Sequence, residues 1–203
     1  MDPELLALVA ATPGFMPDDE GLALHAAALR VAGPVVEVGS YCGRTTLLLA
    51  DAARRRGTVA VTVDHHRGSE EHQEGWAYHD PALVDPATGR IDTLPHLRRA
   101  LAAGGLEDHV VVVVGRSEVV GRLWGGRAGL VLLDGSHVED QAQRDYEAWA
   151  PAVAPGGLLA VHDVFPDPAD GGQAPYHVWR RALLDGFTAA GTTGSLRLLR
   201  CSG

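Results

Sequence analysis

The chain has 203 residues, of which 46% are hydrophobic and 21% are charged, and its formal net charge at pH 7 is −9. These values are typical of a globular domain that is long enough to bury a core. The acidic balance argues against a nucleic-acid partner, which favours a basic face. The longest apolar runs fall short of the ~20 residues of a membrane-spanning helix, and no signal-peptide pattern opens the sequence. We expect one cytoplasmic domain, residues 1–203, with no membrane or nucleic-acid partner.

Lysine is absent from the sequence, and this absence excludes three kinds of enzyme site. A phosphate-binding P-loop needs Gly-Lys-Ser/Thr, and a pyridoxal-phosphate enzyme needs a lysine Schiff base. Short-chain dehydrogenases need a Tyr-x-x-x-Lys pair. The two cysteines, Cys42 and Cys201, do not make a disulfide framework. We expect both to be buried as small hydrophobic residues. The basic run 54–56 ends a predicted helix. Cationic side chains there interact favourably with the free carbonyl groups of the last turn, so we expect a structural role.

Helical and strand patterns alternate along the chain. In chain order they predict helices over 4–11 and 18–32, a strand over 35–38, a helix over 44–56, a strand over 58–63, a helix over 93–103, a strand over 109–114, a helix over 117–124, a strand over 129–134, a helix over 138–153, a strand over 158–162, a helix over 175–186 and a hairpin over 187–200 that turns near 191–194. Residues 1–32 are thus N-terminal helices. Residues 65–92 are loop-like, and an insertion of this length could act as a lid over a pocket.

This alternation predicts an α/β fold with helices on both faces of a parallel sheet. We expect a Rossmann-like, doubly wound, seven-stranded and mostly parallel sheet whose C-terminal hairpin is antiparallel. Ligands of such sheets bind outside the carboxyl ends of the strands. The residues that directly follow each strand are therefore the candidate site residues.

A glycine turn follows the first predicted strand, over the run Glu37-Val38-Gly39-Ser40-Tyr41-Cys42-Gly43. Glycines let a ligand approach the backbone, and the next helix offers free N–H groups. Asp64 ends the second strand about 20 residues later, where an acid can hold both hydroxyls of a ribose. The spacing is not Gly-x-Gly-x-x-Gly, so it favours a cofactor without a pyrophosphate. Taken alone, the glycine motif also fits an ordinary strand-to-helix turn.

These residues resemble the class I S-adenosylmethionine-dependent methyltransferases. Residues 36–43 are similar to the family's first motif, Glu/Asp-x-Gly-x-x-x-Gly, and Asp64 falls at its ribose-binding acid. Residues 115–117 lie where the family contacts adenine, and 132–137 and 155–163 are similar to its later motifs. The resemblance covers roughly residues 33–165 and the terminal hairpin. It implies S-adenosylmethionine as cofactor and a set of cofactor-binding residues: Glu37, Gly39, Ser40, Tyr41, Gly43, Asp64, His65, Ser117 and Asp134.

Three potential metal ligands follow two predicted neighbouring strands: Asp134, His162 and Asp163. Two carboxylates and an imidazole suit a divalent ion. Mg²⁺ prefers the carboxylate oxygens, whereas a histidine ligand favours Mn²⁺. The arrangement resembles the metal-dependent O-methyltransferases of the catechol type and their sugar-modifying relatives. That resemblance implies a metal beside the accepting hydroxyl. His162 stands where those enzymes carry an acid, so the alternative is that His162 and Asp163 only line the pocket or cap a loop.

His137 lies three residues after Asp134, where the catechol-type enzymes carry a lysine base. A histidine has a reference pKa near ~6.5, which suits proton removal at neutral pH. The resemblance therefore implies His137 as the catalytic base. The alternative is that His137 caps the following helix or contacts Asp134.

Together these features predict an enzyme that transfers a methyl group from S-adenosylmethionine to a hydroxyl of a small-molecule metabolite, assisted by a divalent metal. One alternative is an NAD(P)-dependent Rossmann oxidoreductase. The other is a non-catalytic module that binds S-adenosylmethionine. The N-terminal helices could also form a homodimer.

Overall fold

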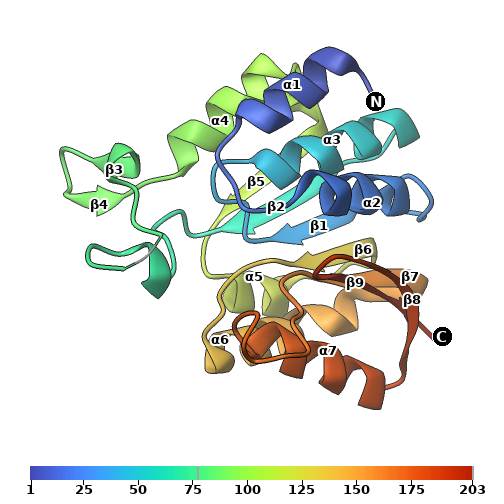
Figure 1. Cartoon of the computed structure of the whole chain (residues 1–203). Coiled ribbons are helices and arrows are strands. Elements are labelled where there is room, and N and C mark those ends of the chain that lie inside the picture. Colours follow the sequence, from blue (N-terminus) through green and yellow to red (C-terminus); the bar gives the residue numbers. More distant parts are fainter. Residues whose placement is uncertain (77, 203) are drawn as a thin grey trace.

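The centre of the fold is a seven-stranded sheet, seen in a computed structural model that describes residues 1–76 and 78–202 (Figure 1). Its strand order is β5-β2-β1-β6-β7-β9-β8. Their bounds are β1 Val35–Val38, β2 Ala60–Asp64, β5 Val110–Val114, β6 Ala128–Leu133, β7 Val153–Val161, β8 Phe187–Thr193 and β9 Leu196–Cys201. The pairs from β5 to β7 are parallel, and β9 runs antiparallel to both of its neighbours. The predicted fold class is confirmed.

Helices cover both faces of the sheet (Figure 1). They are α1 Pro3–Ala11, α2 Asp18–Ala28, α3 Arg44–Arg56, α4 Leu94–Ala103, α5 Ser117–Leu123, α6 Glu139–Trp149 and α7 Ala174–Leu184. Side chains alternate between the faces along a strand. In β6, Leu130 and Leu132 pack with residues of α2 and α3, whereas Val131 and Leu133 pack with residues of α6 and α7. Burial on both faces explains why this strand is apolar at every position. None of the helices in the described part of the chain is long and apolar enough to cross a bilayer.

The insertion 65–92 is more ordered than the predicted loop. It contains the 3₁₀ turns η1 Glu70–His72 and η2 Pro81–Leu83 and a short antiparallel hairpin of β3 Val84–Asp85 and β4 Arg90–Ile91. Leu83 and Ile91 pack against Cys42, which is fully buried in the glycine turn, while Cys201 is only half-buried. This apolar contact attaches the insertion to the edge of the site. Two further 3₁₀ turns, η3 Glu107–His109 and η4 Ala150–Ala152, precede β5 and β7.

Several predicted boundaries were wrong, and one of them has a clear cause. Helix α6 ends at Trp149, and β7 begins at Val153 rather than at 158, so Gly157 lies inside a strand. A Cβ on Gly157 would stand 2.8 Å from the carbonyl oxygen of Gly129, where the β6–β7 register shifts. Glycine here permits close backbone approach in an irregular strand pair and does not end an element. Helix α2 also ends at Ala28 rather than at 32, and β8 and β9 meet at Gly194–Ser195, beyond most of the predicted turn.

A buried carboxylate joins α2 to α3. The Asp51 side chain is fully buried, with Oδ2 2.9 Å from Nε2 of His25, and it pairs with Arg54 at 2.7 Å and Arg55 at 2.6 Å. These arginines belong to the basic run at the end of α3, and Arg56 donates to the carbonyl of Gly33. All three arginines make contacts within the protein, Arg54 and Arg55 with Asp51 rather than with the predicted free carbonyls.

We expect Asp51→Asn to lower the free energy of unfolding by about 2–4 kcal/mol, because the change removes the buried carboxylate that pairs with two arginines and hydrogen-bonds to His25. Urea denaturation followed by circular dichroism measures this loss. The control is Asp18→Asn, since the Asp18 side chain is 74% exposed in its pair with Arg44 and such pairs contribute at most ~1 kcal/mol. Equal midpoints for the two variants would contradict the assignment.

Candidate active site

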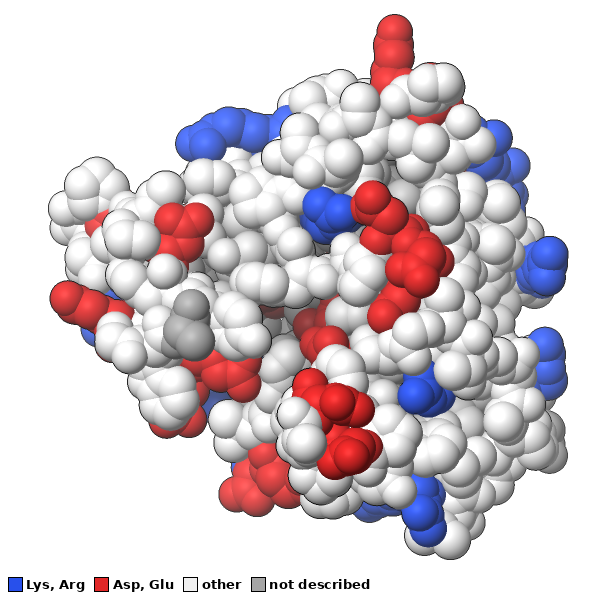
Figure 2. Space-filling model, in the orientation of Figure 1, with Lys and Arg blue, Asp and Glu red and all other residues white. Residues whose placement is uncertain are grey.

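A cavity of about 740 Å³ opens at the carboxyl ends of the central strands. Its lining comes from the N-terminal loop around Phe15, the glycine turn, the insertion and the residues that follow β5, β6 and β7. Figure 2 shows the hollow with acidic side chains gathered around it. The volume lies in the range of sites for small ligands and cofactors. The position, where the strand order reverses beside β1, is the usual ligand crevice of such a sheet.

The glycine turn forms one wall of this cavity. Gly39 has φ +90°, and a Cβ there would collide with the backbone carbonyl of Asp134. Gly43 has φ +100°, and a Cβ there would stand 2.7 Å from Leu97. Both positions therefore require glycine. The buried hydroxyl of Ser40 also lines the cavity and has no hydrogen-bond partner in the described part of the chain. This unpartnered Oγ is a polar group at the cavity wall that suits a polar ligand such as the predicted cofactor.

Asp64 lies beside the glycine turn, as predicted. Its Oδ2 accepts the N–H groups of Ser40 at 3.0 Å and Tyr41 at 2.9 Å, and its Oδ1 accepts that of His66 at 2.7 Å. These bonds fix the carboxylate at the cavity wall. His65 also lines the cavity, and its Nδ1 accepts the N–H of Arg67.

Glu37 lies behind the turn and does not line the cavity. Its Oε2 accepts the hydroxyls of Thr46 and Thr62, both at 2.6 Å, so it connects β1, β2 and α3. Burial raises the pKa of Glu37 to about 8, against the lowering effect of the two threonines. The carboxyl group is therefore mostly protonated at neutral pH. A role for Glu37 or Gly43 in cofactor contact stays a prediction.

Ser117 begins α5 at the opposite end of the cavity. Its hydroxyl donates to the carboxylate of Asp145, and its carbonyl accepts the indole N–H of Trp149 at 3.1 Å. Asp145 lines the cavity, and burial raises its pKa to about 6. The sequence reasoning missed Asp145. A signal existed, because this acid falls on the buried face of α6 between Ala142 and Trp149.

The three predicted metal ligands do converge. Ligand atoms of Asp134, His162 and Asp163 lie within 4.8 Å of one another. However, both ring nitrogens of His162 face carboxylates: Nδ1 is 2.9 Å from Oδ1 of Asp134, and Nε2 is 2.9 Å from Oε2 of Glu20. Burial lowers the pKa of His162, but the carboxylates of Asp134 and Asp163 outweigh burial and raise it to about 11. The imidazole therefore competes with any cation for the carboxylates of Asp134 and Asp163. All three residues stay candidates for a cation site.

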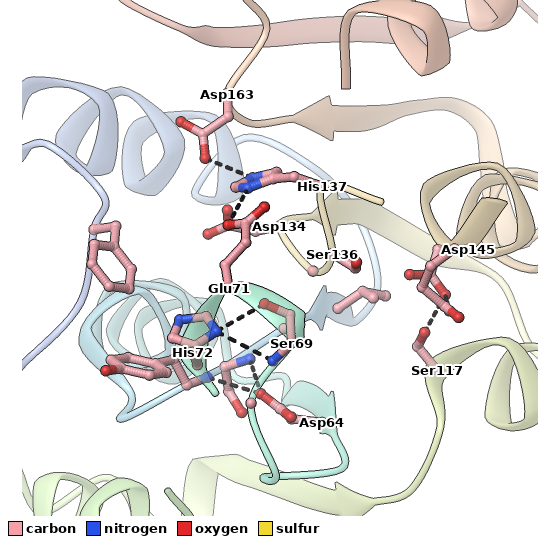
Figure 3. A pocket seen from close by; sticks show the side chains of 18 of the residues that line it. Asp64, Ser69, Glu71, His72, Ser117, Asp134, Ser136, His137, Asp145 and Asp163 are labelled. Carbon is pink, nitrogen blue, oxygen red and sulfur yellow. Dashed lines mark hydrogen bonds and ion pairs between the residues drawn. The ribbon is translucent and has the colours of Figure 1, made fainter. Parts of the chain in front are cut away.

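His137 lies between two other carboxylates (Figure 3). Its Nε2 is 3.0 Å from Oδ2 of Asp163, and its Nδ1 is 3.2 Å from Oε2 of Glu71. The hydrogen bond that His137 donates to Asp163 raises the pKa of His137 to about 9, and burial opposes this rise. Glu71 belongs to the insertion, and nothing in the sequence predicted its pairing with a residue after β6.

Four rings form a wall of the cavity, here called the aromatic wall: Phe15, Tyr41, His72 and Tyr78. Ring centroids are 5.3 Å apart for Phe15 and Tyr41, 5.3 Å for Phe15 and Tyr78, and 5.1 Å for Tyr41 and His72. Phe15 is 54% exposed and Tyr78 is 51% exposed, so both leave apolar surface open.

The N-terminal loop is held in place by Arg44, which donates to the carbonyl of Met16 at 3.1 Å.

Comparisons with known proteins agree with this geometry. A family model described as a methyltransferase domain matches residues 36–164, which is more than half of the chain. The O-methyltransferase TomG from Streptomyces achromogenes, solved with S-adenosylmethionine, is 18% identical with a TM-score of 0.64, covering 100% of this chain and 91% of TomG. An O-methyltransferase from Bacillus cereus, solved with S-adenosylhomocysteine, is 16% identical with a TM-score of 0.64, covering 98% of this chain and 91% of that one.

The sheet order, the glycine turn and the acid that ends β2 define a class I S-adenosylmethionine-dependent methyltransferase. The chain belongs to the methyltransferase-domain family.

We expect Glu37→Gln to change how stability depends on pH. Between the ordinary pKa near ~4.3 and the folded value of about 8, folding holds a proton that the unfolded chain releases. The free energy of unfolding that Glu37 contributes therefore falls as pH rises from the unfolded pKa to the folded pKa. Glutamine does not titrate, so the variant should not show this fall. Relative to the parent protein, the variant should gain up to ~1.4 kcal/mol per pH unit in urea denaturation between pH 5 and pH 8. Glu4→Gln, at an exposed position in α1, is the control. A Glu37→Gln gain that stays constant with pH would contradict the protonated state.

Proposed function

We propose that the enzyme transfers the methyl group of S-adenosylmethionine to a hydroxyl of a small molecule. The observation that carries the proposal is His137, held by Asp163 and Glu71 at the cavity that the glycine turn and Asp64 also line. A module that only bound the cofactor would have no use for this paired base. The oxidoreductase alternative lacks support, because the turn does not have the Gly-x-Gly-x-x-Gly spacing of dinucleotide sites.

In this proposal the chain positions the reactants and handles one proton. The cofactor, when bound, supplies a methyl group activated by its sulfonium. Asp64 receives the ribose hydroxyls, and Asp145 with Ser117 lies at the adenine end. In its neutral form His137 keeps an Nε2–H that donates to Asp163, and its Nδ1, which faces Glu71 at 3.2 Å, takes the proton of an acceptor hydroxyl that enters between the two side chains. Glu71 then faces the charged ring and stabilises it.

The cavity lining limits the acceptor. The aromatic wall offers open ring surface from Phe15 and Tyr78. Acidic side chains outnumber arginines in the cavity lining: Asp64, Glu70, Glu71, Glu118, Asp134, Asp145, Asp163 and Asp170 stand against Arg44, Arg116 and Arg144. Rings stack on planar groups, and clustered carboxylates repel anions. We therefore propose an acceptor that carries a ring and has no negative charge.

A divalent cation, Mg²⁺ or Mn²⁺, is the finer part of the proposal. Asp134 and Asp163 would hold it, since their carboxylates converge and oxygen is the ligand that Mg²⁺ prefers. Such an ion would lower the pKa of a nearby acceptor hydroxyl. The cytoplasmic location and the homodimer stay predictions.

The substrate prediction is tested with S-adenosylmethionine labelled in its methyl group and a panel of hydroxyl compounds. We expect transfer to uncharged or amine-bearing phenols and ring-bearing alcohols, and less transfer to matched compounds with a carboxylate or phosphate. Mass spectrometry of the products gives the number of methyl groups and, after fragmentation, their position. Preferred transfer to the anionic members would overturn the charge argument.

His137→Gln should lower kcat by ~10²–10⁴-fold, the usual contribution of a general base. Without added metal, the rate of the parent enzyme should rise with pH and level off near pH 9, because only neutral His137 accepts a proton. The variant should lose this dependence. His177→Gln is the control, since His177 pairs with Glu139 on the surface and does not line the cavity. An unchanged pH profile in His137→Gln would exclude the base role.

The metal is tested by titrating Mn²⁺ calorimetrically into EDTA-treated protein. We expect one bound ion that Asp134→Asn and Asp163→Asn each weaken, while Asp167→Asn, at an exposed position of the same loop, has no effect. Methyl transfer should fall in EDTA and return with Mn²⁺. Full activity in EDTA together with no heat of binding would remove the cation and leave the His137 chemistry intact.

A further inference from the structure

A buried acid from the N-terminal helix α2 reaches the rim of the site. Glu20 is only 4% exposed, and its Oε2 lies 2.9 Å from Nε2 of His162. His162 is itself 2% exposed, and its Nδ1 lies 2.9 Å from Oδ1 of Asp134. The three side chains therefore form a continuous row from α2 to the end of β6. The row ends on Asp134, which lines the cavity beside the glycine turn.

The same carboxylate also holds the turn between β8 and β9. Oε1 of Glu20 accepts the backbone N–H of Ser195 at 2.7 Å, and Oε2 accepts its hydroxyl at 3.0 Å. Gly194, with φ +49°, leaves room for this contact, because a Cβ there would collide with Oε1 of Glu20. Glu20 thus contacts both the hairpin turn and His162, and its Oε2 is shared between the Ser195 hydroxyl and His162 while its Oε1 faces the turn.

The contact of Glu20 with His162 affects the orientation of the imidazole ring, which the contact with the turn does not. A buried imidazole has few rotamers, and a carboxylate on its Nε2 side fixes which way Nδ1 points. Nδ1 then lies 2.9 Å from Oδ1 of Asp134 and 3.3 Å from Oδ2 of Asp163. Both carboxylates line the cavity, and the shorter contact is to Asp134. An outer residue of this kind sets the orientation of a group that touches the reactants.

We propose that Glu20 is a positioning residue for methyl transfer, acting through His162 to fix the Asp134 carboxylate. The inference rests on the proposed function. It also gives α2 a role in the reaction, although α2 lies outside the matched residues 36–164. The N-terminal segment is then part of the catalytic unit as well as part of the pocket wall.

The test compares Glu20→Gln with Ser195→Ala. Glutamine keeps an oxygen for the backbone N–H of Ser195 but removes the carboxylate from His162. Alanine removes the hydroxyl contact to Glu20 and leaves the pair with His162. We expect Glu20→Gln to lower kcat ~10- to 100-fold for the best acceptor of the panel, the size of effect that misplacement of a reacting group produces. Its Kd for S-adenosylhomocysteine should change less than twofold, and Ser195→Ala should keep the parent kcat.

A second measurement does not depend on any acceptor. In protein labelled with ¹⁵N-histidine, the ring nitrogens of His162, assigned with His162→Gln, should shift in Glu20→Gln and not in Ser195→Ala. If the parent enzyme methylates nothing in the panel, the proposed function fails while this spectrum still tests the contact. Unchanged His162 signals, or equal kcat losses in both variants, would overturn the positioning role and leave Glu20 as a support of the hairpin turn.

Discussion

The site depends on the close approach of two parallel strand ends, β1 and β6, where Gly39 packs against the backbone of Asp134. Any side chain at Gly39 would push these ends apart, so the contact sets the distance between the cofactor side and the acceptor side of the cavity. The same turn is held from the other side by Asp64, which accepts two of its N–H groups. One tight turn thus determines where the wall for the cofactor ends and where the carboxylate rim begins.

Electrostatics at that rim is organised as alternating carboxylates and imidazoles. His162 lies between Asp134 and Glu20, and His137 lies between Asp163 and Glu71. Removing one of these carboxylates would lower stability, because the imidazole beside it would lose its partner and an unpaired buried charge is strongly disfavoured. The rim remains acidic, which suits a positively charged methyl donor and disfavours anionic acceptors.

The sequence predicted the parts of the site that follow from strand ends. Asp64, Asp134, His162 and Asp163 each stand at or directly after a strand, and parallel strands bring such residues together at one edge. Sequence could not predict the partners that reach this edge from elsewhere. Glu20 arrives through the packing of a helix, and Glu71 arrives through an insertion that docks on Cys42 by apolar contact. The contact between His162 and Glu20 escaped prediction for the same reason, because no local pattern places α2 beside the residues that follow β7.

The central claim is that this cavity binds S-adenosylmethionine through Asp64. Isothermal titration with S-adenosylhomocysteine, on the parent protein and on Asp64→Asn, tests it most directly, with NAD⁺ titrated in parallel. We expect S-adenosylhomocysteine to bind the parent protein and NAD⁺ to give no heat. We expect Asp64→Asn to lose the binding of S-adenosylhomocysteine while it remains folded by circular dichroism. Binding of NAD⁺ with no binding of S-adenosylhomocysteine would contradict the account.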